Sequence, residues 1–108
     1  MKSIIALLTV GYFVLGVPLW AADAQAGKAV YDTKCKTCHA AAGEGNAALA
    51  KTLKVEFKAL ASKEVQAKSD ADLKKVVSQG EGKMKPVTGL SDKQVEDVVA
   101  FVRSLAKS

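Results

Sequence analysis

The chain has 108 residues, of which 16 are Lys or Arg and 11 are Asp or Glu, giving a formal net charge of +5. This length fits one domain and is too short for two. The basic residues are scattered among acidic ones, without the interleaved aromatic side chains on which nucleic-acid bases stack, so we expect no nucleic-acid binding.

The N-terminal segment has the pattern of a secretory signal peptide. Lys2 supplies a positive start, and residues 4–17 form an apolar run that glycine and threonine interrupt. The run falls short of the roughly 20 residues that span a membrane comfortably. We expect a signal peptide over residues 1–24 and one domain over residues 25–108, located in the periplasm with no membrane span after cleavage. An uncleaved N-terminal anchor that faces the periplasm is the alternative.

The position of the cut is open between about residues 21 and 24. Ala22-Asp23-Ala24 supplies small residues for cleavage and favours a cut after Ala24. Cuts after Ala21 or Ala22 are nearly as suitable.

The rest of the chain has a helical pattern, and no segment alternates between apolar and polar residues as a strand does. A first helix is expected from Ala24 to about Lys36, with Gly27 and Tyr31 on one face. The glycine-rich residues 43–46 predict a loop.

Shorter segments are expected in the middle of the chain. The apolar residues within 49–57 indicate a short or irregular segment, and Ser62 is a suitable N-cap for a brief helix through Lys68. A longer helix is expected between Ser69 and Gly80, because the segment begins like a capping box and ends on glycine.

The last helix is the best specified element. Residues 81–89, before it, are rich in Gly and Pro and predict an extended loop. Ser91 is the expected N-cap and Gln94 completes a capping box. The expected buried stripe consists of Val95, Val98, Val99, Val102 and Leu105, with Phe101 at its edge. The sequence therefore predicts an all-α domain of three main helices plus short segments.

Two cysteines and one histidine carry the clearest chemical signal. Cys35 and Cys38 are three residues apart and His39 follows directly, so near a helix terminus all three side chains project to one side. This spacing is the attachment pattern of c-type haem, in which two thiols form thioethers with the vinyl groups and the imidazole becomes an axial ligand. The pattern predicts one covalently attached haem c with its iron.

Three alternatives for these residues stay open. A structural disulfide suits an even number of cysteines in a secreted chain, although so small a loop would add little stability. A thioredoxin-like redox pair needs a strand-helix-strand setting that a helical chain does not offer. Structural zinc needs four ligands, and the chain supplies only Cys35, Cys38 and His39.

Met84 is the candidate for the opposite axial position. It is the only methionine after the signal peptide, and it lies in the loop bounded by Gly and Pro rather than on an apolar stripe, so the usual packing role of methionine is disfavoured. His39 is the only histidine, which excludes two histidine ligands within one molecule. Lys83, Lys85 or an open position are the alternatives. We therefore expect His39 and Met84 to be the metal ligands.

Five short motifs then occur in an order that resembles the class I cytochromes c of bacteria, which carry a single haem. The motifs are Gly27-Lys28-Ala29-Val30-Tyr31, Cys35 to His39, Gly82-Lys83-Met84, Leu90-Ser91-Asp92 and residues 99–105. The resemblance spans nearly the whole mature chain. It implies a small helical domain wrapped around one haem, in which Gly27 and Tyr31 cross the last helix near Phe101.

Two positions depart from that family's pattern. Family members often have a proline soon after the attachment motif, whose carbonyl orients the histidine, and often have Met-Pro directly. Here residues 46–49 lack proline, and Lys85 separates Met84 from Pro86. A backbone acceptor for Nδ1 of His39 is still expected, because such a bond fixes the tautomer and the ring orientation.

The expected function is one-electron transfer. With both axial positions filled, the iron has no place for a substrate, and the chain has no spare histidine for acid-base chemistry. We expect no catalytic residues, and a monomeric carrier that exchanges electrons with redox partner proteins. Two alternatives stay open: a haem-based ligand sensor or peroxidase-like enzyme with a labile Met84, and a haem-free helical adaptor.

Four lysines flank the ligand segments, and they are Lys34, Lys36, Lys83 and Lys85. They would steer acidic partners toward an exposed haem edge. The alternative is that they are ordinary solvated lysines.

Overall fold

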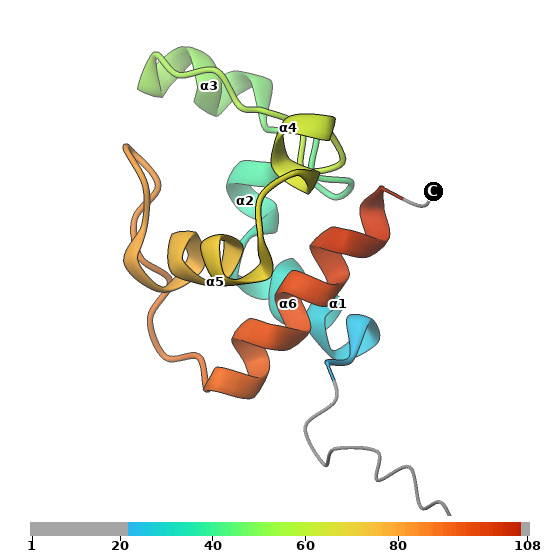
Figure 1. Ribbon diagram of the computed structural model, residues 1–108. Helices are drawn as coiled ribbons and strands as arrows, with labels where there is room; N and C mark the ends of the chain where they lie inside the picture. Colours follow the sequence, from blue (N-terminus) through green and yellow to red (C-terminus); the bar gives the residue numbers. More distant parts are fainter. Residues whose placement is uncertain (1–21, 107–108) are drawn as a thin grey trace, which may run out of the picture.

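The computed structural model describes residues 22–106, which form six helices (Figure 1). These are α1 (Ala24–Lys34), α2 (Lys36–His39), α3 (Ala47–Leu53), α4 (Lys63–Gln66), α5 (Asp70–Gln79) and α6 (Asp92–Leu105). The only paired extended backbone among these residues is an isolated bridge between Glu81 and Met84. The all-α prediction is confirmed. Residues 1–21 of the predicted signal peptide lie outside the described residues. None of the described helices is long and apolar enough to cross a membrane.

Side chains cap the start of every helix in this part of the chain except α2. The capping residues are Asp23, Asn46, Ser62, Ser69 and Ser91. Each cap satisfies backbone N–H groups of the first turn and stabilises its helix by about 1 kcal/mol. At α6 the predicted capping box is complete, because Ser91 and Gln94 each accept a hydrogen bond from the other's backbone N–H. The three serine caps are confirmed, and those at Asp23 and Asn46 were not predicted.

α1 crosses α6 at a glycine. A Cβ on Gly27 would lie 1.9 Å from the carbonyl oxygen of Asp97, so only glycine lets the two backbones approach this closely. One turn further along α1, the ring of Tyr31 packs on that of Phe101 with centroids 4.8 Å apart. Val98 completes this buried cluster. The predicted crossing of the first and last helices is confirmed.

The opposite side of α6 packs against α4 and α5. Val65, Leu73 and Val99 form a second buried cluster there. Phe101, expected at the edge of the stripe, is buried, while Val102 is only half-buried. The reason is that α6 contacts helices on two sides rather than along one stripe.

Arg103 joins the turn between α4 and α5 to α6. Its Nη1 donates to the carbonyl oxygen of Gln66 at 2.8 Å, and its Nη2 lies 2.9 Å from Oδ1 of Asp70. One side chain thereby connects three helices.

Candidate functional site

Cys35, Cys38 and His39 lie on one short turn. Cys35 ends α1 and begins α2, and its carbonyl accepts hydrogen bonds from the N–H groups of Cys38 at 3.2 Å and of His39 at 3.0 Å. Both cysteines are free thiols, with Cys35 half-buried and Cys38 exposed. The structure therefore brings the three predicted residues together.

The surroundings of this turn disfavour the alternatives to haem. The two thiols do not form a disulfide. Burial, with a smaller repulsion from Cys38, raises the pKa of the Cys35 thiol, whereas redox-active cysteines have lowered pKa values. Within residues 22–106, no group of three or more His, Cys, Asp or Glu side chains is placed to hold a metal ion, so a zinc site finds no support.

The imidazole of His39 lies half-buried beside Phe57. The two ring centroids are 5.9 Å apart, with the rings edge to face. Burial lowers the pKa of His39, which favours the neutral imidazole that binds metals. Its Nδ1 is buried and has no hydrogen-bond partner among the described residues, so the predicted backbone acceptor is absent. A buried nitrogen without a partner costs about 1–3 kcal/mol.

The loop after His39 explains the missing acceptor. The N–H of Gly45 donates to the carbonyl of His39 at 2.8 Å, and that of Asn46 donates to the carbonyl of Cys38 at 2.8 Å. The side-chain amide of Asn46 donates to the carbonyl of Thr37 at 3.2 Å. The loop therefore turns N–H donors toward α2, whereas the family that the sequence resembles often has a proline here whose carbonyl orients the histidine. Asn46 was not singled out from the sequence, because its role depends on this folded-back path.

A hollow of about 300 Å³ opens beside Phe57. It is lined by residues 44–47, Ala50 and residues 55–57. A Cβ on Gly45 would lie 2.5 Å from Cβ of Phe57, so glycine at this position gives the aromatic ring its place. Two free thiols, a half-buried imidazole and a neighbouring hollow fit a haem attached through cysteines.

Met84 lies in the loop between α5 and α6. The N–H of Glu81 donates to the carbonyl of Met84 at 3.0 Å, and the N–H of Met84 donates to the carbonyl of Glu81 at 2.9 Å. Gly80 begins this loop with φ of 78°, and a Cβ there would lie 2.4 Å from the carbonyl oxygen of Met84. In Figure 1 the loop lies to the left of α2, with α3 above both. The fourth predicted haem-binding residue thus comes from a separate segment of the chain.

The two lysines beside Met84 differ in their surroundings. Nζ of Lys83 donates to the carbonyl of Leu53 at the end of α3, which connects the loop to that helix. Lys85 is exposed. Because its ammonium group is already engaged, Lys83 is a poorer alternative ligand than Met84.

Comparison with known sequences agrees with this geometry. A sequence model of the family described as cytochrome c matches residues 24–106. The chain belongs to the cytochrome c family. As a cytochrome c, it carries electrons through one covalently attached haem c with its iron.

Relatives of this cytochrome c cover nearly its whole length. It is 36% identical over 116 residues to cytochrome c6 of Picosynechococcus sp., across 100% of this chain and 97% of the relative. It is 31% identical over 108 residues to cytochrome c6 of Cyanidioschyzon merolae, across 99% of this chain and 97% of the relative. Among solved structures it resembles the c-type cytochrome KustC0563, with a TM-score of 0.63 and 29% identity over 73% of this chain and 95% of that one.

Proposed function

We propose that Cys35 and Cys38 bind the haem of this cytochrome c through thioethers, and that His39 and Met84 are the axial ligands of its iron. The observation that carries this proposal is one turn presenting two free thiols and the half-buried imidazole of His39. Met84 is supported by its place in a loop in which its backbone pairs with that of Glu81, and by the lack of a second histidine in the sequence.

The residues of the site suit one-electron transfer. The bound haem supplies an iron that gains and loses one electron. The thioether of Met84 favours the reduced state and so raises the reduction potential. The bridge to Glu81 and the bond from Lys83 to α3 keep the loop of Met84 in place, so the ligand moves little between oxidation states. With both axial positions filled, no position is left for a substrate, and we propose a carrier rather than an enzyme.

Absorption spectra of the exported, haem-loaded protein test the ligands. We expect the ferric protein to show the weak charge-transfer band of a methionine sulfur on iron. Met84→Ala should remove this band and leave the haem attached, while Lys85→Ala, a change in the same loop, should keep it. Persistence of the band in Met84→Ala would contradict the assignment of Met84.

The thioether bonds are tested by the cysteine variants. On a denaturing gel stained for haem, the wild-type polypeptide should retain its stain, because covalent bonds survive unfolding. A protein with both Cys35→Ala and Cys38→Ala should lose the stain. Wild-type protein that releases its haem on denaturation would contradict the proposal.

Carbon monoxide separates the carrier from a ligand sensor or peroxidase-like enzyme. We expect the reduced wild-type protein to be indifferent to carbon monoxide, because Met84 occupies the position at which gas would bind. The Met84→Ala protein should bind it. Tight binding by the wild-type protein would favour the sensor.

We also propose that the N-terminal segment, up to a cut between residues 21 and 24, acts as a signal peptide and that the carrier works in the periplasm as a monomer. The positive start and the apolar run of the sequence support export. The alternative is retention of the segment as a membrane anchor. Fractionation of expressing cells should place the haem protein in the released periplasmic fraction, whereas an anchored protein would stay with the membranes.

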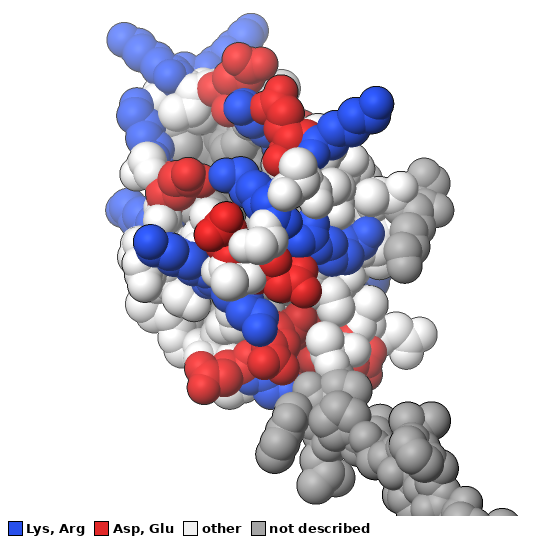
Figure 2. All heavy atoms as spheres, viewed as in Figure 1, with Lys and Arg blue, Asp and Glu red and all other residues white. Residues whose placement is uncertain are grey.

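Its redox partners are proposed to be acidic. Lys34, Lys36, Lys83 and Lys85 flank the two ligand segments and would attract them. Figure 2 shows basic and acidic side chains intermixed over α5 and α6, where Arg103 pairs with Asp70 and Lys74 with Glu96. That face therefore offers no surface of one sign for docking.

A further inference from the structure

Asp97 is a charged side chain inside the domain. It is 3% exposed and is the one buried charged residue in the described part of the chain. Its carboxylate accepts a hydrogen bond from the backbone N–H of Asp23 at 2.8 Å, and it pairs with Nζ of Lys93 at 2.9 Å. A buried carboxylate is costly without such partners. One of its partners therefore comes from the segment that precedes the first helix.

Asp23 also starts α1. Its Oδ1 accepts hydrogen bonds from the N–H groups of Gln25 at 2.9 Å and Ala26 at 3.3 Å, and its carbonyl accepts one from Gly27 at 2.9 Å. The side chain of Asp23 thus satisfies two N–H groups of the first turn that have no partner within the helix, and its carbonyl accepts the first backbone bond of the helix. Its carboxylate is also favourably placed at the positive end of the helix dipole.

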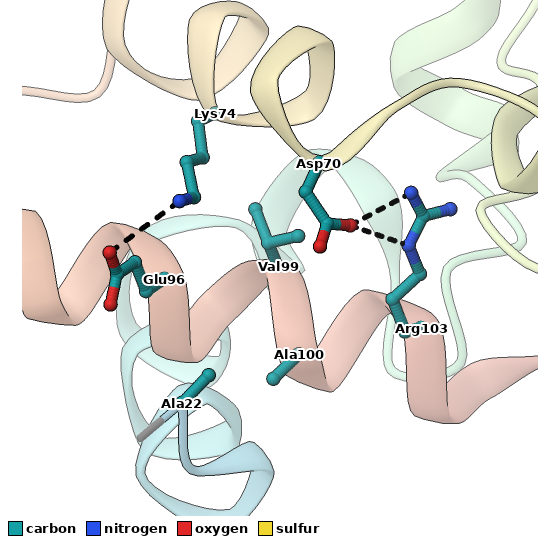
Figure 3. A pocket seen from close by; sticks show the side chains of 7 residues that line it. All are labelled: Ala22, Asp70, Lys74, Glu96, Val99, Ala100 and Arg103. Atoms are coloured by element: carbon teal, nitrogen blue, oxygen red, sulfur yellow. Dashed lines mark hydrogen bonds and ion pairs between the residues drawn. The ribbon is translucent and has the colours of Figure 1, made fainter. Parts of the chain in front are cut away.

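These contacts lie where α1 and α6 approach most closely. Gly27 faces the backbone of Asp97. Asp97 therefore contacts both the first turn of α1 and Asp23, the residue before that helix. Ala22 extends this arrangement. Figure 3 shows it at the edge of a pocket of about 120 Å³ between α5 and α6, beside Glu96 and Ala100. Ala22 and Asp23, which precede α1, therefore belong to the folded domain.

This placement distinguishes among the possible cuts, and the inference rests on the proposed signal peptide. A cut after Ala24 would remove the cap of α1 and the backbone partner of Asp97. A cut before Asp23 would remove neither. We propose that the signal peptide is cleaved ahead of Asp23, between Ala21 and Ala22 or between Ala22 and Asp23, so that Asp23 remains in the mature protein. This proposal differs from the cut after Ala24, which the small residues alone favour.

The reaction is a hydrolysis by the export peptidase. Water adds across one peptide bond, leaving a carboxylate on the released leader and an amino group on the mature chain. If the bond before Asp23 is the one cleaved, the new ammonium group takes the place of the N–H that faces Asp97 and forms an ion pair with it.

The start of the mature protein tests the proposal directly. The full-length chain would be expressed with export and haem attachment, and the periplasmic protein would be analysed by N-terminal sequencing and intact mass. We expect a chain that begins at Ala22 or Asp23. A chain that begins at Gln25 would overturn the proposal, as would an uncleaved chain. Neither outcome depends on the haem ligands, so this result is independent of the spectra.

Mature chains with defined N-termini test whether Asp23 stabilises the folded domain. A foreign leader with a known cut would produce mature chains that begin at Asp23 or at Gln25, and thermal unfolding would be followed by circular dichroism. We expect a clearly lower midpoint for the chain that begins at Gln25. In the Asp97→Asn background the difference between the two starts should shrink, because the carboxylate that Asp23 satisfies is gone. Equal midpoints for the two starts with Asp97 intact would overturn the proposal.

Discussion

Ala40, the residue after His39, has φ of 64°. A side chain with a Cβ is strained in this conformation by about 1–3 kcal/mol. The hydroxyl of Tyr31 donates to the carbonyl of Ala40, and Tyr31 itself is 1% exposed in the core. The bond from a fixed core residue keeps Ala40 in this conformation and thereby sets the path of the chain beside the proposed haem ligand.

Replacing Ala40 by glycine should stabilise the protein. Glycine removes the strain but costs about 0.5–1 kcal/mol in conformational entropy, so we expect a net gain of about 1 kcal/mol, or about 4–8 °C in the thermal midpoint. Thermal unfolding by circular dichroism measures this shift. Ala41→Gly, at a neighbouring position without positive φ, should give no gain. A lower midpoint for Ala40→Gly would show that the residue is not strained.

The carboxyl group of Asp97 should make stability depend on pH. Burial raises its pKa, but the hydrogen bond from Asp23 and the ammonium of Lys93 outweigh burial and bring the pKa below the ordinary 3.8. Because the pKa of Asp97 is lowered in the folded state, its ionised carboxylate contributes fully to stability at pH values above the ordinary pKa. This stabilisation is lost as the pH falls through the pKa of the folded state.

The Asp97→Asn variant measures that contribution. Hydrogen bonds to charged groups are worth about 2 kcal/mol, so we expect a loss of this size in the free energy of urea unfolding at about pH 6. The gap between wild type and variant should narrow as the pH falls below the ordinary carboxyl pKa of 3.8 and Asp97 becomes protonated. Asp92→Asn, at an exposed position of α6, is the control. A gap that does not change with pH would contradict the expectation.

Local spacing is what made the candidate site predictable. Cys35, Cys38 and His39 are neighbours in sequence, so one turn of helix necessarily brings them together. Asn46 and Asp97 were not predicted, because the first depends on the path of a loop and the second on a neighbouring helix. The expected acceptor for Nδ1 of His39 is wrong for the same reason.

At the scale of helices, the crossing of α1 and α6 depends on Gly27. In Gly27→Ala, the new methyl group would overlap the backbone of Asp97 and force the helices apart. We expect a loss of about 1–3 kcal/mol, typical of overpacking, although alanine favours an isolated helix by about 1 kcal/mol. Thermal unfolding measures the net effect.

Substitution of a nearby alanine by glycine is the control for Gly27→Ala. Ala29→Gly changes an exposed position of α1 and should cost only the helix propensity of about 1 kcal/mol. If Gly27→Ala were more stable than wild type, the close contact between the two backbones would be refuted.

The helices themselves were predictable to different degrees. The starts of α5 and α6 follow from serine caps close in sequence, and Gly80 ends α5 as expected. The break at Cys35, where α1 gives way to α2, was missed because the helical pattern continues through it. The position of Phe101 was also wrong, since which side of α6 is buried depends on the helices that pack against it.

At the scale of the whole molecule, charge should control how fast partners are met. We expect electron exchange with an acidic redox protein to slow as salt rises, because the screening length falls to about 8 Å at physiological ionic strength. Lys85→Ala should slow the reaction about threefold at low salt, one lysine's share of the 10–10³-fold acceleration that steering provides. Stopped-flow rates measure both effects.

A lysine outside the ligand segments is the control for steering. Lys75→Ala removes an equal charge from an exposed position on α5 and should change the rate less. Rates that are independent of salt would refute attraction of acidic partners and leave these lysines as ordinary solvated side chains.

The pairing of the first helix with the last also sets the order in which the protein can assemble. α1 buries Gly27 and Tyr31 mainly against α6, so a growing polypeptide cannot complete its core until its final residues have been synthesised. Throughout that interval Cys35 and Cys38 belong to an open chain. Until α6 has been made, both thiols would therefore be open to covalent attachment of the haem.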